Sequence, residues 1–334
     1  MLVNVGKLMS HTSTKGGGGV KHPFNPSLVD AWFMSGLSNS DKPTQIVGVK
    51  KNKLQLKNFT YALNSGFGEY ATDFNSWAHF NPIETTSNKI MLGGIGFRNI
   101  VTTKKAVPEL KILVSGFKGN IAYKYKTGGS FSNITINDNG VYTLPASEAI
   151  INTDTDINRL YTTNASADYS GMTIELLPTA YEGALVFDGV DDYGICNNLP
   201  ILTDYTVICR RVIENDTNVV ASKSIVAGNG AFIFEYANNA TYSFSEYTSG
   251  LNMNLKDSVS YQTKNSYNGS VITVGTANDT DTLTLGIIRE KNSRLLKGAI
   301  YYFALYNKSL TPEEIEEEKV KLENYWEGGK NELA

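Results

Sequence analysis

Two segments bracket the C-terminal part of the chain and constrain its fold more than any other feature. In residues 183–194 an apolar run meets the turn pair Asp188-Gly189 and a second apolar run follows, so we expect two strands that flank a sharp polar corner. In residues 298–315 the run Ala299–Tyr306 is apolar and aromatic throughout, as in a strand that protein covers on both faces. Both segments predict strands of one β domain.

A helix is predicted directly after the second segment, over residues 312–326. Thr311 suits the N-cap, Pro312 the first helical position and Glu314 the third, which together make a capping box. The acidic run 313–318 is expected to face water and to complement the positive end of the helix dipole. One apolar helix face, formed by Ile315, Leu322 and Trp326, is expected to pack on the β domain.

The composition indicates a mainly β protein. The length of 334 residues predicts two domains, or three small ones. Only 19% of the residues are charged, and 19 tyrosines and 30 glycines accompany many asparagine, threonine and serine residues, a mixture typical of strands joined by polar turns. No apolar run is long enough to span a bilayer, and the first residues lack the features of a secretory signal, so we expect no membrane insertion.

Four regions are predicted along the chain. Residues 1–25 form a flexible Gly-rich basic arm, and residues 26–88 an N-terminal attachment segment in which Leu28–Met34 is expected to be a short helix or buried turn. Short β-prone runs separated by turns predict a small antiparallel β-sandwich over residues 89–180. Residues 184–334 form the β domain with the terminal helix.

The front of the chain is basic. Residues 1–60 contain eight lysines and two aspartates, an excess of six positive charges. The lysines are not interleaved with arginines or aromatic residues, and no nucleic-acid-binding module surrounds them, so we expect no nucleic acid partner. Docking on an acidic protein surface, or plain solvation, is the favoured interpretation.

The bracketing segments 183–194 and 298–315 resemble the opening and closing strands of a laminin-G-like, concanavalin-A-like jelly roll. This resemblance implies a C-terminal jelly-roll domain. Such domains usually serve as display or binding modules.

Residues for catalysis are scarce. The histidines His11, His22 and His79 all precede the two predicted β domains, so those domains lack a Ser-His or Cys-His nucleophile and a His-rich metal site. The Glu-x-Asp-x-x-Glu strand motif of jelly-roll glycosidases is absent. Glu235 and Glu246 fall on the two arms of a predicted hairpin, where such carboxylates are usually surface residues. We expect no enzymatic activity and no cofactor.

Two side-chain clusters allow alternatives. Asp188, Asp191 and Asp192 supply oxygen donors that suit Ca²⁺, but they lack the spacing of an EF-hand loop and are better explained as a tight turn, so no metal is predicted. Cys196 and Cys209 lie on neighbouring predicted strands and can pair, although buried free thiols are the commoner outcome in a chain without a signal peptide.

The ligand-binding residues that we predict are the aromatic side chains Tyr236, Tyr242 and Tyr247. Together with Phe244 they can form a stacking platform for a sugar, since an aromatic face offers apolar contact beside a polar edge. Side chains alternate between the two faces of a strand, so about half of these aromatic rings should point into the core.

The order of the whole chain carries a second resemblance. A Gly-rich basic arm, the front motif in 35–43, the sandwich ending in 174–178 and the motif in 185–193 resemble virion structural proteins of phages that infect gut Bacteroides-type bacteria, including crAss-like phages. The resemblance implies a head fibre, capsid decoration or tail-associated protein, made in the host cytoplasm and located on the particle surface.

This second resemblance also implies the partners. The N-terminal part would attach to other virion proteins, and the jelly roll would face host or mucosal glycans. By analogy with fibres and decorations, a homo-oligomer such as a trimer is expected. One alternative is a surface or secreted carbohydrate-binding lectin of a bacterium, against which the missing signal peptide argues. A glycan depolymerase is the other, and the missing carboxylate motif disfavours it.

Overall fold

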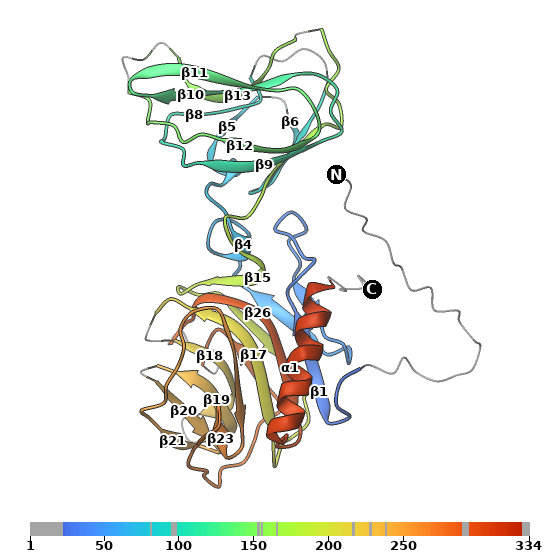
Figure 1. The fold of residues 1–334 in the computed structure, drawn as a ribbon, viewed down its shortest axis with the longest axis vertical. Coiled ribbons are helices and arrows are strands. Elements are labelled where there is room, and N and C mark those ends of the chain that lie inside the picture. Colours follow the sequence, from blue (N-terminus) through green and yellow to red (C-terminus); the bar gives the residue numbers. More distant parts are fainter. Residues whose placement is uncertain are drawn as a thin grey trace, which may run out of the picture.

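The protein is described here by a computed structural model, which covers residues 23–328 except 81, 95–98, 152, 153, 155, 165, 216, 217, 227, 228, 238 and 289–293. Within these residues the fold is mainly β, with several antiparallel sheets and one C-terminal helix. Most of the predicted arm, residues 1–22, lies outside the described part. Figure 1 shows two sandwiches, a small one and a larger one, joined where β4 and β15 meet.

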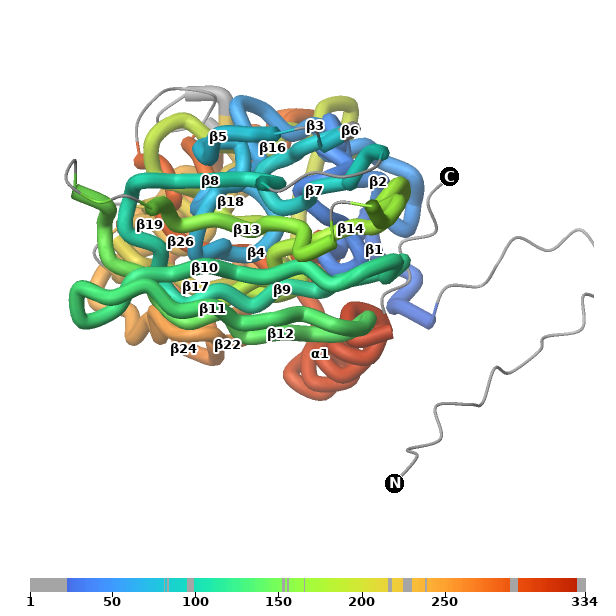
Figure 2. Tube along the Cα trace, turned by 90° about the horizontal axis from the view of Figure 1, so that it is seen from above, coloured from blue at the N-terminus to red at the C-terminus, as the bar shows by residue number. Residues whose placement is uncertain are grey.

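The small sandwich consists of two five-stranded antiparallel sheets (Figure 2) and a single 3-10 turn, η1 (Phe74–Ser76). One sheet has the order β11 (Ser130–Ile136), β10 (Ile121–Thr127), β13 (Asn158–Thr162), β8 (Val101–Thr103) and β5 (Ala78–His79). The other has the order β12 (Gly140–Leu144), β9 (Leu110–Ser115), β14 (Thr173–Leu176), β7 (Lys89–Leu92) and β6 (Pro82–Thr85).

The pattern of the small sandwich follows from alternation along its strands. In β9, Leu110, Ile112 and Val114 are buried while Lys111 faces solvent, so one face of the strand contributes to the core. Ile174 of β14 joins the same apolar cluster. The sandwich that we expected over residues 89–180 begins slightly earlier, because β5 and β6 precede residue 89.

The larger sandwich has two antiparallel sheets of eight strands each. The helix-side sheet has the order β24 (Ser270–Val271), β23 (Ser266–Tyr267), β22 (Ser258–Thr263), β17 (Thr206–Ile213), β26 (Lys297–Tyr306), β15 (Ala180–Asp188) and β4 (Gly66–Glu69), with β1 (Leu28–Phe33) also paired to β26. The far sheet has the order β2 (Gln45–Val47), β3 (Lys53–Lys57), β16 (Tyr193–Cys196), β25 (Leu283–Leu285), β18 (Val219–Val226), β19 (Asn229–Tyr236), β20 (Ala240–Ser243) and β21 (Glu246–Thr248).

The front of the chain corrects the domain boundaries that we predicted. Strands β1 to β4, all within residues 26–88, pair with strands of both sheets of the larger sandwich, so this region is not a separate segment in front of a 184–334 domain. Leu28–Phe33 is a strand rather than the predicted short helix or buried turn. Its backbone pairs with β26 apart from a register shift between Leu28 and Asp30, and its side chains are nearly all buried in the apolar clusters on the two faces of the sheet.

Strand β26 and helix α1 (Pro312–Glu327) behave largely as their sequences predict. Nine of the ten residues of β26 are buried, and α1 begins with the predicted capping box at Thr311. Ile315 and Leu322 pack in an apolar layer between α1 and the helix-side sheet. One residue of the acidic run differs from expectation: Glu318 is buried, and the hydrogen bond that the Tyr306 hydroxyl donates to it at 2.9 Å offsets the cost of that burial.

The two cysteines are buried free thiols. Cys196 lies in β16 of the far sheet and Cys209 in β17 of the helix-side sheet, so they are not on neighbouring strands. Burial raises the pKa of both thiols. Across the described part of the chain, no helix combines the length and apolar character that a bilayer crossing requires.

Candidate functional site

The three tyrosines predicted to bind ligand come together on the far sheet. Tyr236 lies at the end of β19, Tyr242 in β20 and Tyr247 in β21, so three consecutive strands each contribute one ring. Ring centroids are 5.2 Å apart for Tyr236 and Tyr242, 5.1 Å for Tyr242 and Tyr247, and 6.4 Å for Tyr236 and Tyr247. These spacings lie within the range of mutual aromatic contact. We call this group the tyrosine cluster.

An irregularity in β19 brings Tyr236 to the cluster. The pairing between β19 and β20 shifts between Ile233 and Tyr236, and Glu235 adopts a left-handed φ of 53°, which is rare for a residue with a side chain. As a result Phe234 and Glu235 both lie in the interior, while Ile233 and Tyr236 share the outer apolar cluster. The backbone strain at Glu235 therefore places Tyr236 on the outer face.

The base of the tyrosine cluster is apolar and sealed. Val219, Ile233 and Ile288 are buried beneath it, and the guanidinium of Arg294 lies 4.6 Å from the ring centroid of Tyr236. Tyr247 is the most accessible of the three rings, with 44% of its surface exposed. The cluster thus offers aromatic surface and a cation to solvent over a buried apolar base.

Sequence reasoning missed Arg294 and Ile288, because both reach the cluster from a distant loop. No local signal in the sequence marks them as neighbours of Tyr236. Phe244, which we expected to join the platform, is instead 7% exposed and lies in the core, with its ring centroid 5.9 Å from that of Tyr205. This agrees with the expectation that only some of the aromatic residues would face outward.

Two carboxylates near the tyrosine cluster have different surroundings. Glu235, expected at the surface, is fully buried and forms an ion pair with Arg211 of the opposite sheet. The Tyr267 hydroxyl also donates to Glu235 at 2.7 Å. Glu246, by contrast, is exposed in β21. The two carboxylates therefore do not face each other across the hairpin, and the expectation of a surface Glu235 was wrong.

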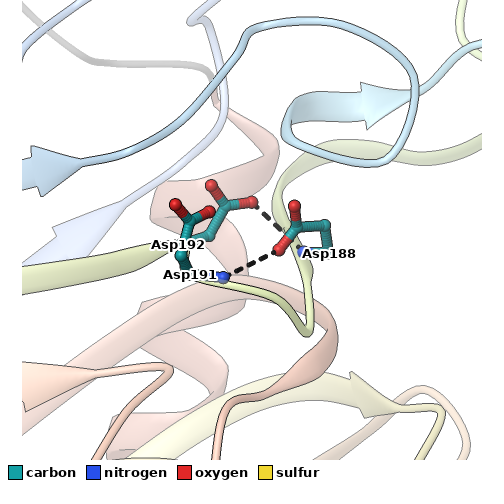
Figure 3. Close-up of side chains that lie close together, drawn as sticks. All are labelled: Asp188, Asp191 and Asp192. Carbon is teal, nitrogen blue, oxygen red and sulfur yellow. Dashed lines mark hydrogen bonds between the residues drawn. The ribbon is translucent and has the colours of Figure 1, made fainter. Parts of the chain in front are cut away.

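The aspartate corner lies between β15 and β16, where the sequence predicts a sharp turn (Figure 3). Asp188 Oδ1 accepts hydrogen bonds from the backbone N–H of Val190 at 2.7 Å and of Asp191 at 3.4 Å. Asp192 accepts from the backbone N–H of Asp188 at 3.2 Å. Gly189 has a φ of 79°, which glycine adopts readily. These contacts are those of a turn closed by its own carboxylates.

One carboxylate oxygen from each of Asp188, Asp191 and Asp192 lies within 4.8 Å of the other two. Asp192 is buried and accepts a hydrogen bond from the Ser65 hydroxyl at 3.0 Å. Burial, and next the nearby Asp188 carboxylate, raise the pKa of Asp192 from 3.8 to about 7. The prediction that the corner serves the turn rather than a metal stays a prediction, and the observed hydrogen bonds agree with it.

Of the three histidines, His79 lies in the described part, in β5 of the small sandwich. Its Nε2 is 2.8 Å from the Phe74 carbonyl oxygen, a backbone contact. His11 and His22 lie outside the described residues.

No protein-family model, no curated protein and no solved structure matches the chain. Function therefore has to be inferred from the residues themselves.

Proposed function

We propose that this chain is a non-enzymatic structural protein of a phage particle that binds glycans through the tyrosine cluster. The observation that carries the glycan-binding part is the convergence of Tyr236, Tyr242 and Tyr247 from three strands onto one outer surface, with ring centroids 5.1 to 6.4 Å apart. The virion part rests on the resemblance in the order of the chain. Aromatic faces stack on the apolar C–H face of a sugar ring, and phenol and guanidinium groups donate to its hydroxyls. Arg294 supplies such a guanidinium beside Tyr236.

The proposal includes the finer identity of the larger sandwich as a laminin-G-like, concanavalin-A-like jelly roll. Two facing antiparallel sheets with an apolar core between them support it, as does the strand nature of both bracketing segments. The far sheet would then be the face that presents the ligand surface.

The non-enzymatic part of the proposal is supported by the carboxylates around the tyrosine cluster. Glu235 is committed to Arg211 and Tyr267 in the interior, which removes it from any substrate on the outer face. Glycoside hydrolysis normally needs two carboxyl groups flanking the scissile bond. Glu246 would have no such partner in Glu235.

In this proposal, the basic arm at the start of the chain attaches it to other virion proteins. Residues 28–69 are less suited to a separate anchor, because their strands are taken up by the sheets of the larger sandwich. A protein lacking residues 1–22 should fail to join particles, and normal incorporation would contradict the role of the arm. A trimer, the oligomer we propose, would have three times the chain mass of 36.6 kDa in solution.

The glycan proposal is tested on the full chain, because a 184–334 fragment lacks strands β1 to β4. On a glycan array, Tyr247→Ala should lower the affinity about tenfold, since one stacking contact is lost. The matched control is Tyr161→Ala, which removes a tyrosine over which Arg159 lies at 4.8 Å in the small sandwich. Unchanged binding by Tyr247→Ala would contradict the site.

Two further outcomes separate the alternatives. Release of oligosaccharides from a bound glycan would overturn the non-enzymatic proposal in favour of a depolymerase. Glycan binding by a chain that is absent from purified particles would favour a bacterial lectin.

A further inference from the structure

A groove lies between the small sandwich, the helix-side sheet and the last turn of α1. It encloses about 720 Å³, within the range of ligand-binding clefts. Figure 1 shows the C-terminal end of α1 on the side of the larger sandwich that faces the small one. The residues that matter in its lining are Tyr70, Glu175, Glu182, Tyr301, Trp326 and Glu327.

The groove carries an excess of negative charge. Across the described part of the chain, Glu175, Glu182 and Glu327 form no ion pair. The one cation among the described lining residues, Arg210, already forms ion pairs with Asp257 at 2.7 Å and with Glu323 at 3.0 Å. Three carboxylates that share one concave surface repel one another, and a cationic occupant would relieve that repulsion.

The aromatic side chains of the groove are already held in place. Arg210 lies 4.5 Å from the ring centroid of Tyr301 and 4.6 Å from that of Trp326, and the Trp326 indole donates to the Gly183 carbonyl oxygen at 2.9 Å. A ligand in the groove would therefore be bound by the carboxylates of Glu175, Glu182 and Glu327 rather than by free aromatic faces.

A cationic segment of the same chain begins beside this groove. Residues 1–22 contain Lys7, Lys15 and Lys21 and no acidic residue. The first described residue, Pro23, shares a hollow with Tyr325 and Gly328 at the end of α1, and Phe24 packs 5.6 Å from the Tyr325 ring. The chain thus enters the fold at the helix end that also carries Trp326 and Glu327.

We propose that residues 1–22 dock in the groove of their own chain, with their lysines facing Glu175, Glu182 and Glu327. An extended chain covers about 3.3–3.6 Å per residue, so a segment that starts at Pro23 can reach the groove. Exposed ion pairs are weak one by one, but covalent attachment raises the effective concentration of the segment. This docking describes the free chain, before residues 1–22 attach to another virion protein. The proposal goes beyond glycan binding, since the groove borders the helix-side sheet and the tyrosine cluster lies on the far sheet.

Carbodiimide cross-linking of the full chain tests the contact directly, because it joins lysine amines only to carboxylates that touch them. Mass spectrometry should find links from Lys7, Lys15 or Lys21 to the three groove glutamates. In a mixture of isotopically light and heavy protein, these links should join residues of the same copy. Links that join light to heavy copies, or no links to the groove, would overturn the proposal.

A variant series measures the contribution of charge. The combined change Glu175→Gln, Glu182→Gln and Glu327→Gln should speed tryptic removal of the N-terminal segment about tenfold. The matched control changes three exposed glutamates outside the groove, Glu84, Glu109 and Glu246, to glutamine. An equal rate in the two variants would overturn the proposal, and circular dichroism of each variant verifies that both are folded.

Discussion

The small sandwich and the larger sandwich differ in how their strands are recruited and in what their interiors contain. The small one draws its strands from the continuous stretch 78–176 and encloses one apolar cluster, with the Lys126–Asp154 ion pair partly exposed beside it. The larger one takes strands from 28–69 and from 180–306, and among its described residues two ion pairs have no exposed side-chain surface, Arg211–Glu235 and Lys223–Asp279.

These buried pairs connect parts of the larger sandwich that are distant in the sequence. Arg211 of the helix-side sheet reaches Glu235 of the far sheet, and its guanidinium also donates to the Ser258 hydroxyl at 2.6 Å and to the Ser260 hydroxyl at 2.9 Å. Removing charges from water is costly, so a pair like this stabilises the fold only while every polar atom keeps its partners. The larger sandwich therefore combines an extensive apolar core with ion pairs that have no exposed side-chain surface, whereas the Lys126–Asp154 pair of the small sandwich stays partly exposed.

The largest expected effect comes from breaking the buried pair on one side. Arg211→Met leaves the Glu235 carboxylate buried without its cation and should destabilise the larger sandwich by about 3–5 kcal/mol. Hydrogen exchange followed by mass spectrometry should show lost protection in β17 and β19 and retained protection in β9. Adding Glu235→Gln should recover much of the loss, and a double variant as unstable as the single one would assign the cost to packing.

A core truncation in the small sandwich should give the opposite distribution. Ile112→Ala removes a fully buried side chain and should cost the small sandwich about 3 kcal/mol through lost burial and a cavity. Exchange should rise in β9 and β14 and stay unchanged in β17. Val141→Ala, at a 60% exposed position of the same sheet, is the control with an expected change below about 0.5 kcal/mol. If protection falls in both sandwiches, they unfold as one unit.

The pH dependence of the larger sandwich should reflect Asp192. Because its pKa is raised from 3.8 to about 7, the folded state holds a proton between those pH values that the unfolded state has released. Stability from this group is full below about pH 4 and declines as pH rises through 7, by about 4 kcal/mol. For Asp192→Asn, the free energy of unfolding in urea should not fall as pH rises from 4 to 7. An equal fall in the variant would contradict the role of Asp192.

The small sandwich should respond to pH in the opposite direction. The hydrogen bond from Lys126 lowers the pKa of Asp154, so its contribution is present above the unfolded pKa of 3.8 and is lost as pH falls below that value. Acid should therefore weaken this sandwich. Asp154→Asn should reduce the acid sensitivity, as measured by exchange of β10 peptides at low pH.

The smallest stability effect is local to the helix. Thr311→Ala removes the side chain that accepts the Glu314 N–H at 3.2 Å and should cost about 1 kcal/mol. Faster exchange should be confined to the first turn of α1. Thr311→Ser keeps the hydroxyl and should behave like the wild type, whereas an equal loss in both variants would assign the effect to the methyl group.

Features with local causes were predictable from the sequence. The helix expected over 312–326 is Pro312–Glu327, and the strand expected over 299–306 is Lys297–Tyr306. The turn at Asp188 also forms where expected. In each case the signal lies in residues that contact one another within a few positions, such as Thr311 and Glu314.

Features with distant causes were not predictable in the same way. Leu28–Phe33 is a strand because β26 accepts it as a neighbour, and Glu318 is buried because Tyr306 lies opposite. Glu235 is interior because Arg211, in another sheet, supplies the compensating charge. None of these partners is visible from the local pattern of the residue concerned.

The tyrosine cluster combines features that the sequence predicts with features that only the tertiary structure decides. From the sequence alone come three tyrosines on a predicted hairpin and the rule that alternating side chains face opposite sides of a sheet. Their convergence depends on the irregular pairing at Glu235, and Arg294 joins them from a distant loop. Local pattern determines which side chains are present, but a contact between strands depends on backbone register and buried charge, which only the assembled sheets define.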